Sequence, residues 1–240
     1  MKRIIGWSWL HQHIPIEERM KVKNQAKIIS VDLINRDFPF DRFCKHDTVF
    51  VTGDGHTLPQ DVKKFESWNI PHDLFCVNRS MIFFERPVTH WAAVDTDEAV
   101  WFSENVNEKI MPEGHRIVRH TIGKLLVGAD VYWEPINFAE PITPVTGVPR
   151  RIWTGNSGLL AILSSIYMGY KKIVLAGIPL DTKQHWYEPE GTEGPNWVGM
   201  VYRQWMDFKI EIPEAENVRS LSGYSAFILG KPTKEWLNGG

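Results

Sequence analysis

The chain has 240 residues, of which 43% are hydrophobic and 23% are charged, and its formal net charge is -2. This composition suits one large α/β domain with a substantial core, and the nearly balanced charge provides no basic surface for nucleic acid or an anionic membrane. No apolar run approaches the roughly 18 to 20 residues of a membrane span, no secretory signal is recognisable, and two cysteines cannot build a disulfide framework, so we expect a cytoplasmic protein.

The first 47 residues are expected to form a lead-in that packs on the edge of the main domain, which spans 48–240. Apolar residues over 14–29 recur at helical spacing, and Pro15 stands where a first-turn proline is tolerated. A short strand over 28–33 and an irregular segment over 35–47 are expected to follow.

From residue 48 onward, predicted strands and helices alternate. The expected strands are 49–52, 73–77, 90–94, 116–121, 172–176 and 218–221, and the expected helices are 60–68, one starting at 96–98, 159–168, 197–208 and one stopped by 230–233. Gly169 is expected to cap the helix before it, and 143–149 has the composition of a loop. Alternation with nearly continuous apolar strands predicts a single α/β domain with a Rossmann-like, doubly wound, mainly parallel sheet.

The turn after the first of these strands carries the strongest local signal. Residues 49–58 read V-F-V-T-G-D-G-H-T-L, and Pro59 then opens a helical segment. Such a junction leaves backbone N–H groups unpaired at a helix N-terminus, where phosphate is a natural ligand. Glycine turns also occur for packing reasons, so the motif alone leaves both interpretations open.

Polar residues follow several of the predicted strands. Because ligands bind beyond the carboxyl ends of strands in an open parallel sheet, we expect these residues to converge on a nucleotide site at one edge. The candidates are Asp54, His56, Thr57, Asn78, Arg79, Asp95, Asn156, Ser157 and Asp181, with Gly177 ending its strand.

Two blocks of sequence have a recognisable pattern. The first is G-D-G-H-T-L at 53–58 with V-N-R at 77–79, and the second is S-G at 157–158 with M-G-Y-K-K-I-V-L-A-G-I at 168–178. Over about 49–181 the chain resembles bacterial sialyltransferases with a Rossmann-like fold and the 6-hydroxymethylpterin pyrophosphokinase-like (MptE-like) family. Members typically show Gly-Asn-Gly-Pro-Ser-Leu, Cys-Asn or Val-Asn, and Ser-Gly-x-x-Ala followed by Gly-Tyr-Lys-x-Ile-x-Leu-x-Gly-Ile-Asp.

This resemblance implies roles for residues of both blocks. Gly53, Gly55 and Thr57 would cradle a phosphate or the sugar of a nucleotide, Asn78 would contact the nucleotide, and Ser157 and Gly158 would bind near the base or ribose. In the sialyltransferases a loop histidine acts as base on the acceptor hydroxyl and tyrosines support the leaving phosphate. His185 and Tyr187 in H-W-Y are the nearest candidates, in a loop at about 182–196 that is expected to be mobile.

Two positions depart from the family pattern, because Asp54 replaces the turn Asn and His56 replaces the Pro. A carboxylate facing a phosphate repels it unless a cation lies between them. Asp54, Asp95 and Asp181 could therefore hold Mg²⁺ at the strand ends. The commoner role of a lone Asp there is to cap a helix, and Asp181 comes two residues later than the family aspartate.

Other candidate residues have equally ordinary alternatives. His56, His90 and His185 could meet at the same edge, although no zinc-type spacing such as H-E-x-x-H exists. His185 could be a general base or a solvated loop residue, and Arg79 could bind phosphate or a neighbouring carboxylate. Cys76 is expected to be buried, and the 11 tryptophans could fill the core or stack on bases and sugars.

The leading functional expectation is a nucleotide-dependent transferase, specifically a glycosyltransferase with a CMP-sugar-like donor and a hydroxyl acceptor. Its catalytic candidates are His185, Tyr187 and Asp54. The alternatives are a Mg²⁺-dependent pyrophosphokinase-like enzyme and a catalytically inactive nucleotide-binding protein. Dinucleotide oxidoreduction is disfavoured because Leu58 occupies the third glycine position of that fingerprint.

Overall fold

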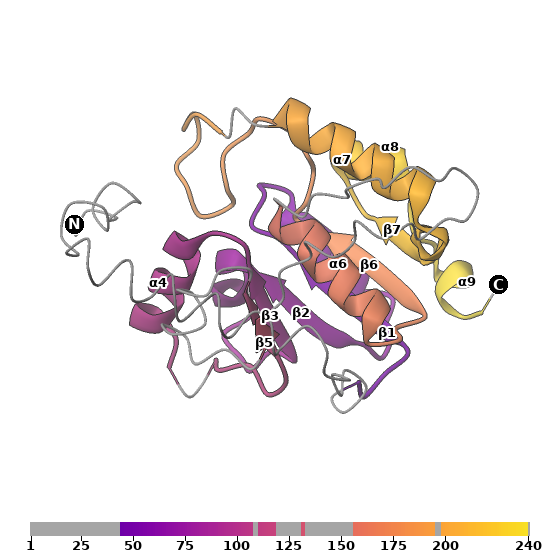
Figure 1. Cartoon of the computed structure of the whole chain (residues 1–240), viewed down its shortest axis with the longest axis horizontal. Helices are drawn as coiled ribbons and strands as arrows, with labels where there is room; N and C mark the ends of the chain where they lie inside the picture. Colours follow the sequence, from indigo (N-terminus) through magenta and orange to yellow (C-terminus); the bar gives the residue numbers. More distant parts are fainter. Residues whose placement is uncertain (1–43, 108–109, 119–130, 133–155, 195–197, 240) are drawn as a thin grey trace, which may run out of the picture.

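The structure is a computed structural model that describes residues 44–107, 110–118, 131–132, 156–194 and 198–239 (Figure 1). Its strands are β1 (Thr48–Thr52), β2 (Asp73–Val77), β3 (His90–Ala93), β4 (Arg116–Val118), β5 (Val131–Tyr132), β6 (Lys172–Ala176) and β7 (Val218–Ser220). They form one seven-stranded sheet in the order β5-β4-β3-β2-β1-β6-β7, in which every neighbouring pair is parallel.

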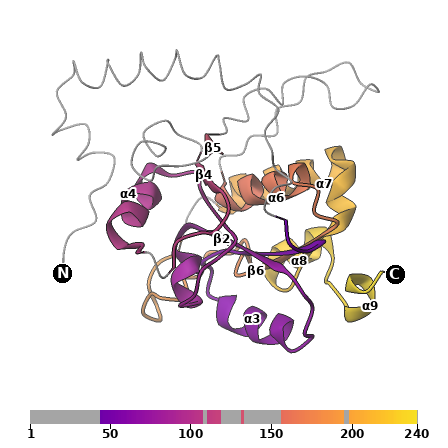
Figure 2. The same ribbon diagram turned by 90° about the horizontal axis from the view of Figure 1, so that it is seen from below.

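Helices cover both faces of this sheet. They are α3 (Leu58–Glu66), α4 (Thr96–Asn105), α6 (Ser157–Tyr167), α7 (Val198–Glu211), α8 (Gly223–Leu229) and α9 (Lys234–Leu237), with the 3₁₀ helices η2 (Asn78–Phe83) and η4 (Pro213–Asn217). Figure 2 shows α3 on one side of the sheet and α6 with α7 on the other.

The alternating side chains of each strand produce two cores. Val49 and Val51 of β1 pack with α6 and α7, whereas Phe50 between them packs with α3, where its ring stacks on Phe65 at 4.2 Å. Both faces of the central strands are buried, and each fully buried apolar side chain contributes about 1.5–3 kcal/mol. These continuous apolar strands explain why the sheet is parallel and covered on both faces.

Local signals set the helix ends that matter for the site. In α6 the Asn156 side chain accepts a hydrogen bond from the Leu159 amide at 3.1 Å, as an N-cap residue does. Gly169 follows the end of α6 with a left-handed φ of +84°, which confirms its expected capping role. Helix α3 begins at Leu58 after Thr57 and carries a proline in its first turn, so it starts two residues earlier than predicted.

The predicted Rossmann-like α/β fold with a doubly wound parallel sheet is confirmed. The predicted strands match to within one residue where the structure describes them, and the part of 116–121 beyond residue 118 lies outside the described residues. So do the helix at 14–29, the strand at 28–33, the loop at 143–149 and nearly all of the lead-in. Strand β5 and helices η2, η4 and α9 were not predicted.

Among the residues that the structure describes, no helix is both long enough and apolar enough to cross a membrane.

Candidate functional site

The sheet order places a topological switch point between β1 and β6. The chain adds strands from β1 outward to β5 and then returns to the other side of β1 with β6 and β7. In such sheets, ligands bind in the crevice outside the carboxyl ends of the strands at the switch point. The turn at 53–57 and the loop at 177–194 leave the sheet there, and Figure 1 shows this loop in orange at that edge.

The two connections at the switch point are bonded to each other. The amide of Gly53 donates to the carbonyl of Ala176 at 2.8 Å, and the amide of Gly55 donates to the carbonyl of Gly177 at 2.8 Å. The Gly177 amide in turn donates to the buried carboxylate of Asp61 at 3.0 Å. The amides of Gly53 and Gly55, which were expected to cradle a phosphate with Thr57, are therefore already used within the fold, and so is the amide of Gly177.

The N-terminus of α6 lies at the same edge, close to this turn. A Cβ at Gly53 would meet the Ile178 side chain at 2.6 Å, and a Cβ at Gly158 would meet the same side chain at 3.5 Å. Ile178 thus fills the space between the two segments that were expected to share a phosphate. The Ser157 hydroxyl accepts a hydrogen bond from the Val94 amide at 3.0 Å, so it ties α6 to the end of β3.

A group of six mutually interacting polar side chains lies beside the turn. We call it the rim cluster, and it comprises Asp54, Arg79, Glu98, His185, Tyr187 and Glu188. Its members come from the turn after β1, from η2, from α4 and from the loop after β6. The fold thus brings together Asp54, Arg79, His185 and Tyr187 as expected, together with two glutamates whose part was not foreseen.

His185 is held in a fixed orientation within this cluster. The Glu188 carboxylate accepts the backbone N–H of His185 at 2.8 Å and lies 3.0 Å from its Nδ1. Because an ionised carboxylate only accepts hydrogen bonds, Nδ1 carries a proton, and in the neutral ring Nε2 carries the lone pair. Nε2 lies 3.9 Å from Asp54 Oδ1, and the Tyr187 ring stacks on the imidazole with centroids 5.4 Å apart.

Burial raises the pKa values of three groups in the cluster, Asp54, Glu98 and Tyr187. The pKa of Asp54 is raised mainly by its burial, against the lowering effect of His185 and Arg79. Burial also raises the pKa of Glu98, and Arg79 opposes that shift. The pKa of Tyr187 is raised by burial and by the Asp54 charge, so its hydroxyl stays protonated and can donate a hydrogen bond.

The loop after β6 is attached to the turn over the part that carries His185. Gly55 and His185 form an antiparallel bridge, and the Trp186 amide donates to the Asp54 carbonyl at 3.0 Å. His56 Nε2 lies 2.9 Å from Asp181 Oδ2. These contacts attach Asp181, His185 and Trp186 to the turn, and the expected mobility of the loop at 182–196 stays a prediction.

The three aspartates proposed for Mg²⁺ have separate surroundings. Asp181 pairs with His56 and also accepts the Lys183 amide at 3.1 Å, Asp54 faces His185, and Asp95 is exposed at the N-cap of α4. Within the described ranges, no group of three His, Cys, Asp or Glu side chains is placed to hold a metal ion. The expected three-aspartate site is therefore not assembled in this arrangement.

Two further candidates have identifiable surroundings. Thr57 precedes α3, and its hydroxyl oxygen lies 2.8 Å from that of Ser222. Asn78 has a left-handed φ of +52° at the end of β2, and its carbonyl accepts the indole N–H of Trp91 at 2.8 Å. The Oδ1 atom of Asn78 is buried with no hydrogen-bond partner, so this side chain could still bind a ligand.

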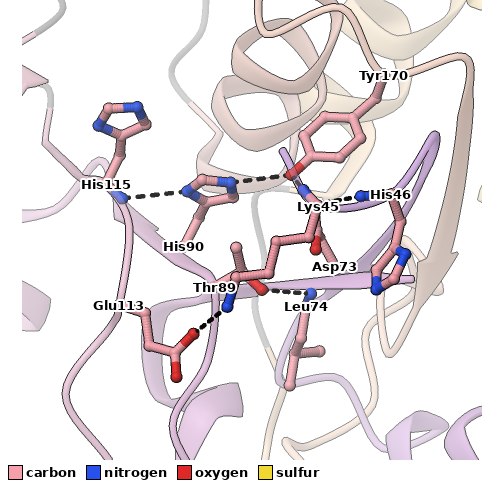
Figure 3. Close-up of polar contacts among 9 residues, drawn as sticks. All are labelled: Lys45, His46, Asp73, Leu74, Thr89, His90, Glu113, His115 and Tyr170. Carbon is pink, nitrogen blue, oxygen red and sulfur yellow. Dashed lines mark hydrogen bonds and ion pairs between the residues drawn. The ribbon is translucent and has the colours of Figure 1, made fainter. Parts of the chain in front are cut away.

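A second polar cluster lies at the opposite, amino edge of the sheet (Figure 3). The Tyr170 hydroxyl donates to Asp73 at 2.8 Å and lies 3.0 Å from His90 Nε2, while His90 Nδ1 accepts the His115 amide at 3.1 Å. The expectation that His90 joins His56 and His185 is wrong, because His90 is the first residue of β3. A hollow of about 490 Å³ lies near this cluster and is lined in part by Cys44, Lys45 and His46.

Sequence reasoning missed the contributions of Glu98, of Glu188 and of Trp101, whose ring centroid lies 5.7 Å from the Arg79 guanidinium carbon. Glu98 lies in the first turn of α4, where acidic residues are common for helix-dipole reasons, so its pairing with Arg79 gave no distinct signal. Glu188 stands three residues after His185, a spacing that could have suggested the contact. Cys76 is fully buried as expected, and burial raises its thiol pKa to about 12.

Comparisons with protein-family models, with curated proteins and with solved structures found no significant match to this chain.

Proposed function

We propose that this protein is a nucleotide-dependent transferase that moves a glycosyl group from a nucleotide-sugar donor to a hydroxyl group of an acceptor. The observation that carries the proposal is the fixed imidazole of His185, which Glu188 holds through Nδ1 while Nε2 faces Asp54. This arrangement lies beside the switch point of a doubly wound sheet, the usual place for a nucleotide in this kind of fold.

His185 has the geometry required of a general base. Its Nε2 would take the proton of the acceptor hydroxyl, and the resulting imidazolium would be stabilised by Glu188 and Asp54 on either side. The acceptor oxygen would then bond to the anomeric carbon of the donor as the bond from that carbon to the phosphate oxygen breaks. The nucleotide would leave with the electron pair.

The separation of His185 and Asp54 suits a substrate hydroxyl. The 3.9 Å between Nε2 and Oδ1 is too long for a direct hydrogen bond. Asp54 therefore does not take up the Nε2 lone pair, and a substrate hydroxyl about 2.8 Å from Nε2 could donate its single proton to it. Tyr187, which remains protonated, would donate a hydrogen bond to the leaving phosphate or to the acceptor.

The two alternatives have less support. Mg²⁺-dependent diphosphate transfer would need carboxylates that converge on a metal, but Asp181 is paired with His56 and Asp95 is exposed at the start of α4. Nucleotide binding without catalysis leaves the His185–Glu188 pair without a role. Treatment with a chelator distinguishes Mg²⁺-dependent diphosphate transfer from the proposed glycosyl transfer, because only the metal-dependent activity would be lost.

The test is the release of nucleotide from CMP-, UDP- and GDP-sugars in the presence of a panel of hydroxyl acceptors, with product detection by mass spectrometry. We expect wild-type turnover of one donor and a loss of about 100-fold or more in His185→Asn, the usual scale for removing a general base. His46→Asn is the matched control, because His46 is exposed at the opposite edge. Equal rates for the two variants, or no turnover of any donor by the wild type, would contradict the proposal.

A further inference from the structure

Arg79 is the permanently charged cation of the rim cluster, and three segments of the chain hold it. It is the second residue of η2. Its guanidinium carbon lies 5.7 Å from the ring centroid of Trp101 on α4 and 5.8 Å from that of Tyr187 on the loop after β6. The side chain is only 16% exposed. Cation–π contact with two rings orients the guanidinium before any ligand arrives.

Most of the hydrogen-bonding capacity of Arg79 is unused. A guanidinium has five N–H donors. Its Nε donates to Glu98 Oε2 at 3.2 Å, and no other hydrogen bond from this side chain is formed to the described residues. The Nη1 and Nη2 groups thus leave a fork of donors whose geometry matches two oxygens of one phosphate.

The neighbouring acidic groups do not occupy this fork. Arg79 lowers the pKa values of Asp54 and Asp97 against their burial, so both carboxylates are near it. Neither forms a hydrogen bond or an ion pair with the guanidinium among the described contacts, and Asp97 Oδ1 is buried without a partner. If the role of Arg79 were to neutralise Asp54 and Asp97, its guanidinium would be expected to contact their carboxylates. No such contact is formed among the described residues.

Two buried polar atoms in residues that precede members of the rim cluster in the sequence also lack hydrogen-bond partners among the described residues. They are Oδ1 of Asn78, which precedes Arg79, and Nε1 of Trp186, which precedes Tyr187. A buried polar group without a hydrogen bond destabilises the fold. Trp186 Nε1 would need an acceptor, such as a phosphate oxygen, and Asn78 Oδ1 would need a donor, such as a ribose hydroxyl.

We propose that Arg79 is the phosphate-recognition residue of the nucleotide donor, which it binds through two parallel hydrogen bonds from Nη1 and Nη2. This inference rests on the proposed function, which it deepens by moving phosphate recognition from the glycine turn to the end of β2. The aromatic contacts with Trp101 and Tyr187 position the guanidinium. The nearby carboxylate of Asp54 opposes the phosphate, so Asp54→Asn should bind nucleotide more tightly than the wild type.

The experiment is isothermal titration of the full chain with CMP, UMP, GMP and AMP and with the matching nucleosides. We expect at least one nucleotide to bind about tenfold or more tightly than its nucleoside, since hydrogen bonds between charged groups are stronger than neutral ones. Arg79→Gln should bind the nucleotide no more tightly than the nucleoside, and its nucleoside affinity should stay within about threefold of the wild-type value. Arg79→Lys keeps the charge without the fork, so its loss should be smaller.

Arg86→Gln is the matched control, because Arg86 also lies near an aromatic ring, that of Phe84 at 5.9 Å, but is exposed. Nucleotide that binds no better than nucleoside, or equal affinities in the Arg79→Gln and Arg86→Gln variants, would overturn the role of Arg79 while nucleotide-dependent transfer through His185 still stands. If Arg79→Gln does not fold, wild-type nucleotide affinity in Arg79→Lys would equally overturn it. A wild type that binds no nucleotide would overturn both this inference and the proposed function.

Discussion

Gly177 shows how a single residue shapes the region beside the rim cluster. Its φ is +62°, and a Cβ there would lie 2.3 Å from the Gly53 carbonyl oxygen and 2.8 Å from the Leu58 side chain. A glycine is needed both for the left-handed backbone and for the close approach of the two connections. The glycines of this region therefore serve packing, which was the alternative interpretation of the sequence motif.

Gly177→Ala should lower the free energy of unfolding by about 2 kcal/mol or more, because the left-handed conformation costs about 1–2 kcal/mol and the contact with backbone adds to it. Gly191→Ala is the control, since Gly191 has a φ of +88° but nothing within 4 Å of its Cβ position. Urea denaturation of both variants measures the difference. Equal losses would mean that the close approach to Gly53 is not a constraint.

At the level of elements, one carboxylate joins three segments behind the site. Asp61 on α3 accepts the Gly177 amide at 3.0 Å and the Ser222 hydroxyl at 2.5 Å, so it connects α3 with the ends of β6 and β7. The residue is 5% exposed. Since Asp61 also fixes the Gly177 amide, it helps to define where the loop carrying His185 leaves the sheet.

Asp61→Ala should destabilise the fold by about 2–4 kcal/mol, because it leaves the Gly177 amide and the Ser222 hydroxyl without their acceptor. The matched control is Asp47→Ala, which removes an exposed ion pair with Lys171 and should cost less than about 1 kcal/mol. Chemical denaturation gives both values. A loss in Asp61→Ala no greater than in the control would show that these elements are held together without the carboxylate.

At the level of the whole molecule, the sequence predicted the features that depend on local pattern, namely the strands, the helices and the fold class. The apolar runs of β1, β2 and β6 and the glycine after α6 identify a parallel α/β fold by themselves. The partners of Gly53 and Gly55 depend on the pairing of β1 with β6, which lies about 120 residues further along the chain, so local sequence left their amides open.

The same limit explains the other errors about the site. His90 was placed in a strand correctly, but its position at the start of that strand sends it to the opposite edge. The contacts of the loop at 182–196 with Gly55 and Asp54 were not foreseen either, because these residues are distant from the loop in sequence. Sequence reasoning could not predict these contacts, because they depend on which strands are neighbours in the sheet.

The amino edge of the sheet makes the stability of the whole molecule depend on pH. Burial, with a smaller contribution from His115, lowers the pKa of His90 from 6.5 to about 3. Because His90 Nδ1 accepts the His115 amide, the neutral ring carries its proton on Nε2, which can donate to Tyr170 (Figure 3). The folded protein therefore keeps His90 neutral at pH values where the unfolded chain protonates it.

Between pH 6.5 and about 3 the unfolded state binds the additional proton, so stability falls as the pH falls. The contribution of His90 approaches about 1.4 kcal/mol per pH unit in this window. His90→Gln removes it, so the free energy of unfolding should decline less steeply from pH 6.5 to pH 4.5 than in the wild type, as measured by urea denaturation. Burial also lowers the pKa of His72, which therefore reduces stability at low pH in the wild type and in the variant alike. The control is His46→Gln at an exposed position, which should keep the wild-type dependence of stability on pH. A His90→Gln variant with the wild-type slope would show that this buried imidazole is not a source of the acid sensitivity.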